Sequence, residues 1–229
     1  MSVVIAIDGT AGCGKGTLAR RLARHYGFAH LDSGALYRLV ALGVLDAGGD
    51  PSKAEDAVHS ARNIDTAAIS DPRLRSVDVG EAASIVAAIP DVRSAILQFQ
   101  QDFAAYPPGG AAGAVIDGRD IGTVVCPDAT VKLFVDALPS VRAQRRWLEL
   151  QNRPKEGGEP SPPVDVSEVE AEILARDERD RSRKVAPLKP APDSILLDTS
   201  DLDIEAAFAK ALELVNPRIE KALAARPRG

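Results

Sequence analysis

A glycine-rich run near the start of the chain carries the clearest chemical signal. It reads GTAGCGKGT and consists of Gly9, Thr10, Ala11, Gly12, Cys13, Gly14, Lys15, Gly16 and Thr17. Glycines let backbone N–H groups converge on phosphate oxygens, and a lysine at the end of such a loop can bridge the β- and γ-phosphates. The alternative is a flexible turn, but four glycines at fixed places, at an average usage of about 7% each, are rare by chance. The run predicts a phosphate-binding loop for a nucleoside triphosphate.

Two oxygen-bearing side chains are candidate ligands for the Mg²⁺ that accompanies a triphosphate. In many such loops a hydroxyl directly follows the lysine, whereas here Gly16 follows Lys15 and Thr17 comes next. Asp117 ends the apolar run 114–116, and an aspartate at a strand end beside the loop would orient the metal. Many strands end in aspartate, so this interpretation depends on the loop. We expect Thr17 and Asp117 to serve Mg²⁺.

The acceptor of the phosphoryl group must be inferred from other polar residues. Asp32 and Ser33 precede a helical pattern and have the residue types that cap a helix, while Arg38 one turn later is able to meet an anion. Arg119 and Asp120 follow the candidate metal ligand directly. These residues place both charge signs near the ends of two predicted strands.

A second polar group stands on a predicted helix. Arg176, Asp180 and Arg183 are spaced at i, i+4 and i+7, so the helix presents them on one face. The charged neighbours at 177, 179 and 181 favour a solvated ion-pair face on charge pattern alone. Cys13 is equally open to two interpretations, because a thiolate is favoured beside a helix start and a small residue also suits the turn.

Buried strands that alternate with helices should position these residues. The predicted strands are 3–7, 28–31, 114–117, 131–135 and 195–198, and the predicted helices are 15–26, 35–45, 140–151, 169–181 and 204–223. This alternation predicts an α/β fold, a doubly wound parallel sheet within a single domain over 1–229. Residues 63–102 interrupt the rhythm and are predicted to be an insertion. Residues 152–165 are rich in Pro, Gly and Glu and are predicted to be a mobile, lid-like segment.

The composition limits the class of protein. The 229 residues are 45% hydrophobic and carry a formal charge of −5, which argues against binding a nucleic-acid polymer. No apolar run approaches the roughly 20 residues of a membrane span, and the start of the chain lacks the basic and apolar regions of a signal peptide. The two cysteines have no metal-ligand spacing. We expect a cytoplasmic protein that is a monomer, because no apolar stripe is evident.

The ordered motifs resemble one family of enzymes. They are GTAGCGKGT, LDSGALYR, ASIVAAIPDVR, IDGRDIGTVVCPDA, RDERDRSRKVAPL and LDTS, and they extend from Val3 to Ala211. This series is similar to the bacterial-type cytidylate kinases, of the nucleoside monophosphate kinase group of P-loop kinases. The resemblance implies transfer of the γ-phosphoryl of ATP to CMP or dCMP with Mg²⁺. It also implies that 63–102 is an acceptor-nucleotide-binding subdomain.

The resemblance assigns roles by position. It implies that residues 9–17 bind ATP, that Ser84 and Arg93 face the cytosine with Asp120 and Arg183 nearby, and that Asp32 and Ser33 belong to the acceptor site. It further implies that Arg38 and Arg119 hold the acceptor phosphate, that Arg176 and Asp180 hold the ribose, and that Arg142, Arg145 and Arg146 approach the ATP phosphates. Lys15, Arg119 and Arg145 would be catalytic. The chain departs from the family in a short stretch at 63–75 and a somewhat long segment at 152–165.

Other functions are open on the residues alone. A monophosphate kinase for another base, such as UMP or AMP, would share the loop. A GTP-dependent switch would need a guanine-reading element such as Asn-Lys-x-Asp, which the sequence lacks. An inactive nucleotide-binding scaffold is disfavoured by Lys15, Thr17 and Asp117 together.

Overall fold

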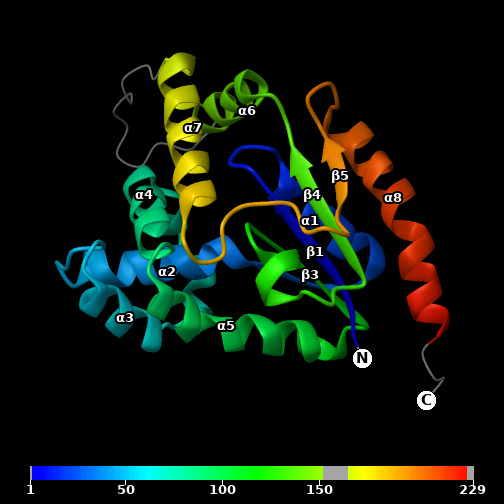
Figure 1. The fold of residues 1–229 in the computed structure, drawn as a ribbon, viewed down its shortest axis with the longest axis horizontal. Helices are drawn as coiled ribbons and strands as arrows, with labels where there is room; N and C mark the ends of the chain where they lie inside the picture. The colour runs from blue at the N-terminus through cyan, green and yellow to red at the C-terminus, as the bar shows by residue number, and fades with distance from the viewer. Residues whose placement is uncertain (1, 152–164, 226–229) are drawn as a thin grey trace.

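A five-stranded parallel sheet forms the centre of the molecule (Figure 1). The computed structural model describes residues 2–151 and 165–225. Its strands are β1 (Val3–Gly9), β2 (Ala29–Asp32), β3 (Gly113–Gly118), β4 (Val131–Asp136) and β5 (Ile195–Asp198), in the spatial order β2-β3-β1-β4-β5. Because β1 and β2 both pair with β3 in parallel, the carboxyl ends of these three strands lie at one edge of the sheet. The predicted doubly wound parallel sheet is confirmed.

Helices cover both faces of the sheet. The helices are α1 (Lys15–Tyr26), α2 (Ser33–Asp46), α3 (Ala54–Arg62), α4 (Val77–Val86), α5 (Pro90–Ala105), α6 (Pro139–Gln151), α7 (Val166–Ser182) and α8 (Ile204–Ala224). Shorter helical turns are η1 (Thr66–Ser70), η2 (Pro72–Arg75), η3 (Pro108–Gly110) and η4 (Ile121–Val125). The predicted strands and helices are all present, with boundaries that differ by a few residues.

The side chains of β1 alternate between two cores. Val4 and Ala6 pack with α2, α4 and α5, whereas Ile5 and Ile7 pack with α1 and α8. Every residue of β1 is buried, as expected for a central parallel strand with helices on both faces. The apolar run that predicted this strand therefore contributes side chains to both cores. The glycine-rich loop begins where this strand ends, at the edge of the sheet.

The segment predicted to be an insertion is helical. Residues 63–102 comprise η1, η2, α4 and most of α5, between α3 and β3. Val79, Val86 and Ile96 from this segment share one apolar cluster with Leu36 and Val40 of α2. Its interpretation as an acceptor-binding subdomain stays a prediction. Of the lid-like segment 152–165, residues 152–164 lie outside the described residues, and Asp165 caps α7 by accepting a hydrogen bond from Ser167 N at 2.9 Å.

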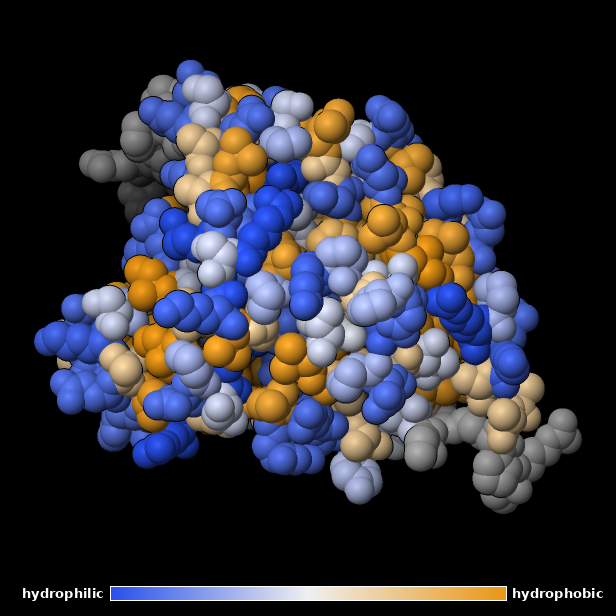
Figure 2. All heavy atoms as spheres, in the orientation of Figure 1, coloured by the Kyte–Doolittle hydropathy of each residue, from blue (hydrophilic) through white to orange (hydrophobic). Residues whose placement is uncertain are grey.

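Apolar side chains are exposed on one edge of the molecule. Figure 2 shows them gathered over β5 and α8, where Leu196 is 67% and Ile204 is 62% exposed. This surface removes the basis for expecting a monomer, namely that no apolar stripe is left over. Among the described residues, no single helix is long and apolar enough to cross a membrane. One bent pair, α4 with 90–110 at an angle of 99°, passes by length and composition.

Candidate active site

The glycine-rich loop joins β1 to α1 at the carboxyl edge of the sheet. Gly9 lies so close to β4 that a Cβ there would stand 2.1 Å from Val135 O, and Gly14 adopts a left-handed φ of 88°. Gly14 is also the residue before α1, and no side chain caps that helix. The first N–H groups of α1 are therefore not taken by a cap and can meet an anion, which is the geometry of a phosphate site.

Lys15 begins α1 and lines a cavity beside the loop. Its Nζ donates a hydrogen bond to Thr10 O at 3.2 Å. Burial, with the nearby Arg119 guanidinium as the next cause, lowers the pKa of Lys15. A bound anion would compensate for the loss of water around Lys15 and would favour its charged ammonium form. The position of Lys15 is therefore suited to bind phosphate.

Cys13 is buried beneath the loop, with 1% of its surface exposed. It belongs to the apolar cluster with Ile7, Leu18 and Leu197. A thiol in this position is shielded from reagents. The structure thus favours the interpretation that Cys13 is a small residue that suits the turn.

Asp117 and Asp32 end adjacent strands and stand side by side in register. His30 Nε2 lies 2.8 Å from Asp117 Oδ1, while Asp117 Oδ2 would be 3.5 Å from a Cβ at Gly16. One carboxylate oxygen is thus held by His30 and the other faces the loop. Burial, followed by repulsion from Asp117, raises the pKa of Asp32. Two carboxylates that repel each other beside a phosphate site are a suitable environment for a cation.

Thr17, the other predicted Mg²⁺ ligand, is not part of the cavity lining, and its role toward the metal stays a prediction. The Thr17 side chain is exposed, and its hydroxyl accepts a hydrogen bond from Arg20 Nη2 at 3.2 Å. Gly9, Thr10, Cys13 and Gly14 also lie outside the cavity lining, where they shape the loop from below.

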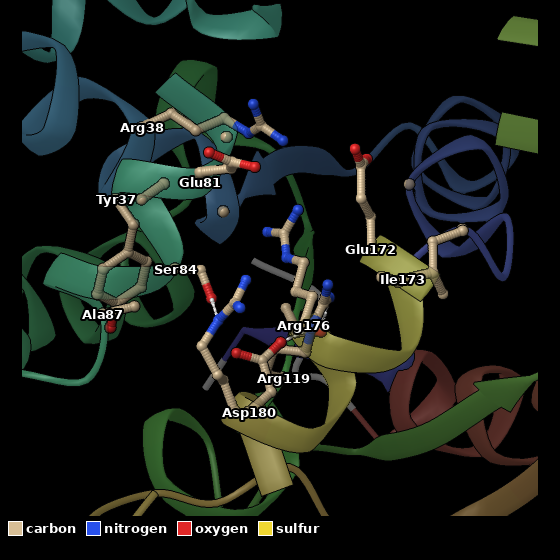
Figure 3. Close-up of a pocket in the computed structure, with 18 of the residues that line it drawn as sticks. Tyr37, Arg38, Glu81, Ser84, Ala87, Arg119, Glu172, Ile173, Arg176 and Asp180 are labelled. Atoms are coloured by element: carbon tan, nitrogen blue, oxygen red, sulfur yellow. Dashed lines mark hydrogen bonds and ion pairs between the residues drawn. The ribbon is translucent and has the colours of Figure 1, made fainter. Parts of the chain in front are cut away.

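The cavity has a volume of about 470 Å³ and extends from the loop to α4 and α7. It brings together most of the predicted site residues: Ala11, Gly12, Lys15, Gly16, Asp32, Ser33, Arg38, Ser84, Arg93, Asp117, Arg119, Asp120, Arg176, Asp180 and Arg183. Figure 3 shows Arg38 and Glu81 on one side, and Glu172 and Arg176 of α7 on the other. The sequence-predicted residues thus form one site, although they come from seven helices and strands and the loops between them.

The middle of the cavity has unmatched positive charge. Arg119 Nε donates to Asp180 Oδ2 at 2.8 Å, and Arg183 Nε donates to Asp180 O at 3.2 Å. Arg176 Nε and Arg183 Nη2 are buried and meet no hydrogen-bond acceptor among the described residues. Burial, with repulsion from Arg119 next, lowers the pKa of Arg176 to about 9. Buried donors without acceptors indicate an anionic ligand.

The far end of the cavity presents both donors and acceptors. Arg93 Nη2 forms a buried ion pair with Asp120, and Arg93 Nη1 donates to Ala87 O at 3.3 Å. The guanidinium also stands over the Tyr37 ring, 5.4 Å from its centre. Ser84 is buried, and its hydroxyl accepts from Arg179 Nε at 3.4 Å, a contact drawn in Figure 3. This arrangement is suited to read the polar edge of a small planar ligand.

The three arginines of α6 have three different environments. Arg146 lines the cavity. Arg145 instead donates to Thr199 Oγ1 at 3.0 Å, Thr199 O at 2.6 Å and Leu202 O at 3.0 Å, so its guanidinium is held at the loop after β5. Arg142 is buried against the backbone of the glycine-rich loop. Of the three, Arg146 lines the cavity in this structure and Arg145 does not, and the roles of all three toward ATP stay predictions.

Sequence reasoning missed three residues near the site. Asp177 is fully buried and Arg179 lines the cavity, although both were grouped with a solvated ion-pair face. Arg179 stands three residues after Arg176 on the same helix face, and that spacing was the available signal. Asp8 is 3% exposed and accepts hydrogen bonds from Ile121 N and Gly122 N. Nothing in its local sequence distinguishes it from an aspartate in a turn.

Comparisons with known proteins show the family of this chain. The family model described as cytidylate kinase matches residues 5–217. The chain belongs to the cytidylate kinase family. A cytidylate kinase of Rhodopseudomonas palustris strain TIE-1 is 55% identical over 93% of this chain and 95% of its own. One from Bradyrhizobium diazoefficiens is 51% identical over 99% of this chain and 100% of its own.

A solved structure shares the fold. It is an uncharacterized protein from Eubacterium ventriosum, with a TM-score of 0.53 and 14% identity, and the alignment covers 94% of this chain and 99% of that one. The cytidylate kinase family match extends through every element that lines the cavity, from α1 to α7.

Proposed function

We propose that the protein transfers the γ-phosphoryl group of ATP to CMP or dCMP, which gives ADP and CDP or dCDP. The observation that carries the proposal is the single cavity that joins the phosphate loop to the polar end at Ser84 and Arg93. Membership of the cytidylate kinase family supports the same acceptor, because the relatives bear that name over nearly their full lengths. The reaction needs both nucleotides in one cleft, and the cavity has room for the phosphates of both.

We assign the acceptor by the chemistry of the lining. Arg38, Arg119 and Arg176 offer guanidinium groups to its phosphate and sugar end. The buried Arg176 Nε has no hydrogen-bond acceptor among the described residues. Asp180 is available to the ribose hydroxyls once the ligand draws Arg119 toward its phosphate. Ser84, Arg93 and Asp120 would meet the cytosine, which presents an amine donor and two acceptors.

The proposed chemistry is direct transfer. A phosphate oxygen of the acceptor attacks the γ-phosphorus of ATP, a new O–P bond forms, and the bond from the γ-phosphorus to the bridging oxygen of ADP breaks. The attacking oxygen is already ionised near neutral pH, so no strong general base is required. Lys15 and the cavity arginines, which surround the transferring group, align it and neutralise its charge in a water-poor site.

We propose that Mg²⁺ enters with ATP. No group of three or more His, Cys, Asp or Glu suited to hold a metal occurs among the described residues. Mg²⁺ bound to nucleotide needs only one or two protein carboxylates, because phosphates and water complete its shell. Asp117, with one oxygen facing the loop and Asp32 beside it, fits that need. When bound, the ion would neutralise phosphate charge, while His30 holds the other oxygen of Asp117.

Coupled ADP release with different acceptors tests the proposal. CMP and dCMP should be good acceptors at saturating ATP, UMP should have a kcat/KM lower by at least roughly tenfold, and purine monophosphates should be poor. Equal or better rates with UMP or AMP would support a kinase of other base specificity. Slow loss of GTP without any acceptor would support a switch. The expected monomeric state and cytoplasmic location stay predictions.

A further inference from the structure

A buried ion pair links two helices beside the phosphate loop. Arg142 of α6 is 2% exposed and Asp177 of α7 is fully buried, and Arg142 Nη1 lies 2.6 Å from Asp177 Oδ2. Neither side chain lines the cavity. A buried charge pair is costly to form unless its remaining donors and acceptors are also satisfied. The remaining donors and acceptors of this pair are satisfied by backbone groups of the glycine-rich loop and of the segment before α6.

Both members of the pair bind the backbone of the same loop residue, Ala11, one at each of its two peptide groups. Asp177 Oδ1 accepts a hydrogen bond from Ala11 N at 2.9 Å, and Arg142 Nη1 donates to Ala11 O at 2.8 Å. Arg142 Nε donates to Ala137 O at 2.9 Å, just before α6. The next residue is Gly12, where a Cβ would stand 3.2 Å from Arg142 O. The ion pair therefore holds the backbone of Ala11, and the backbone of Arg142 limits the space at Gly12.

The same helix carries the acceptor side of the cavity. Arg176 precedes Asp177, and Asp180, one turn later, pairs with Arg119. Arg176 is repelled by Arg119, Arg38 and Arg146, which lie in the loop after β3, in α2 and in α6. An anion in the cavity would relieve this repulsion and draw these elements toward α7. Because Asp177 accepts a hydrogen bond from Ala11 N, a shift of α7 would be transmitted to Ala11.

We propose that Asp177 is a positioning residue that couples the two ends of the cavity, so that bound CMP tightens the binding of ATP at the phosphate loop. The proposal rests on the proposed function, which supplies CMP as the acceptor. Binding coupling is reciprocal, so ATP must tighten CMP by the same factor. The Asp177 side chain does not line the cavity. It would therefore act on the nucleotides indirectly, through its hydrogen bond to Ala11 N and through α7.

Isothermal titration with a non-hydrolysable ATP analogue and Mg²⁺, with and without saturating CMP, tests the coupling. In the wild type, CMP should lower the Kd of the analogue by about fivefold or more, within the usual range of binding coupling. Asp177→Asn keeps the Oδ1 acceptor for Ala11 N but places an amide donor against Arg142. The factor by which CMP lowers the Kd of the analogue should then fall to near one. The Kd of CMP alone should change by less than about threefold.

Glu178→Gln is the matched control, because Glu178 is the next residue on α7 and is exposed. It should keep the wild-type factor. If Asp177→Asn does not fold, the double variant Arg142→Met with Asp177→Leu replaces the ion pair by apolar contacts and should also lose the coupling. A wild-type factor near one, or an unchanged factor in both Asp177 variants, would overturn the proposal. CMP-dependent ADP release by the wild type tests the function separately.

Discussion

At the scale of single residues, Lys15 is the cation on which the phosphate site most depends. It starts α1, lines the cavity, and has a pKa lowered by burial. Lys15→Ala should leave the fold intact, because the side chain makes its one hydrogen bond to a loop carbonyl. Turnover should fall by at least ~10²-fold, by analogy with the loss of other charge-stabilising donors. Steady-state kinetics and circular dichroism check this, with the exposed Lys53→Ala as control.

The same measurements identify the outcome that would contradict this assignment. A folded Lys15→Ala protein with near-normal turnover would remove Lys15 from catalysis. A loss of activity in Lys53→Ala would show that charge alone, away from the cavity, accounts for the effect.

Arg93 is the residue that should read the base. It is 7% exposed and is held by Asp120, Ala87 O and the ring of Tyr37, so its guanidinium has little freedom to adapt. UMP presents N3–H where CMP presents an acceptor, and a donor that faces a donor costs about 1–3 kcal/mol. Arg93→Ala should raise the KM for CMP strongly, leave the KM for ATP little changed, and narrow the preference for CMP over UMP.

The kcat/KM values for CMP and UMP at saturating ATP decide this prediction. Arg181→Ala, which removes an exposed arginine from the end of α7, serves as the control and should keep the preference. An identical CMP-to-UMP ratio in wild type and Arg93→Ala would mean that Arg93 does not read the base. Its buried pair with Asp120 would then be structural.

At the scale of elements, Asp8 fastens β1 to the turn η4, directly after the segment that carries Arg119 and Asp120. Its two carboxylate oxygens accept from Ile121 N at 2.7 Å and Gly122 N at 2.8 Å. Burial raises the pKa of Asp8 to about 7, against the two backbone donors that lower it. Asp8→Asn keeps one acceptor and turns an amide donor toward an N–H. We expect a loss of about 1–3 kcal/mol in unfolding free energy.

The raised pKa also predicts a pH dependence of stability. The folded-state pKa lies above the unfolded value near 3.9, so the contribution of Asp8 is complete below that value and is lost as the pH rises through about 7. Asp8→Asn does not titrate. The stability advantage of the wild type over the variant should therefore shrink by on the order of 1–3 kcal/mol between pH 5 and pH 8. Urea unfolding of both proteins at four pH values checks this, and a constant or growing advantage would contradict it.

The elements were more predictable than their contacts. Strands such as 3–7 and 131–135 are buried on both faces, and their continuous apolar runs showed this directly. The glycine-rich loop was also evident, because glycine is required where Gly9 approaches β4 and where Gly14 is left-handed. The pair of Arg142 with Asp177 was hidden, because charged residues on a helix are usually solvated and their burial depends on a partner 35 residues away.

The direction in which each side chain points was the other feature that could not be predicted from the sequence. Arg142, Arg145 and Arg146 lie in one helix turn and are equivalent by composition, but only Arg146 lines the cavity. Arg145 faces the carbonyls of Thr199 and Leu202, which come from a distant strand and its following loop. The sequence contains no local signal for such a partner. The motif series predicted the acceptor residues as a set, and the structure places that set around one cavity, which no single helix pattern would have predicted.

At the scale of the whole molecule, one cavity collects residues from both halves of the chain. α2 and α4 contribute Arg38 and Ser84 on one side, and α7 contributes Arg176 on the other, with the phosphate loop between them. Figure 1 shows these helices at the same end of the sheet, although they are far apart in the sequence. A ligand that extends through the cavity therefore has to bring these distant segments together.

A bisubstrate ligand tests whether the two nucleotide sites are parts of one cavity. Adenosine and cytidine joined through five phosphates should occupy both ends at once, because the cavity is continuous from Lys15 to Ser84. At a hundredfold excess over its Kd, such a ligand stabilises the folded state by about 2.7 kcal/mol. For a chain of this size, that corresponds to a rise in Tm of roughly 5–10 °C.

Adenosine linked to a second adenosine through five phosphates should stabilise less, because the polar end at Ser84 and Arg93 is matched to cytosine. Thermal unfolding with each compound, and with ATP or CMP alone, gives the comparison. Equal Tm shifts for the two bisubstrates would show that the far end of the cavity does not select the base, and a shift no larger than that of ATP alone would show that the two sites are not occupied together.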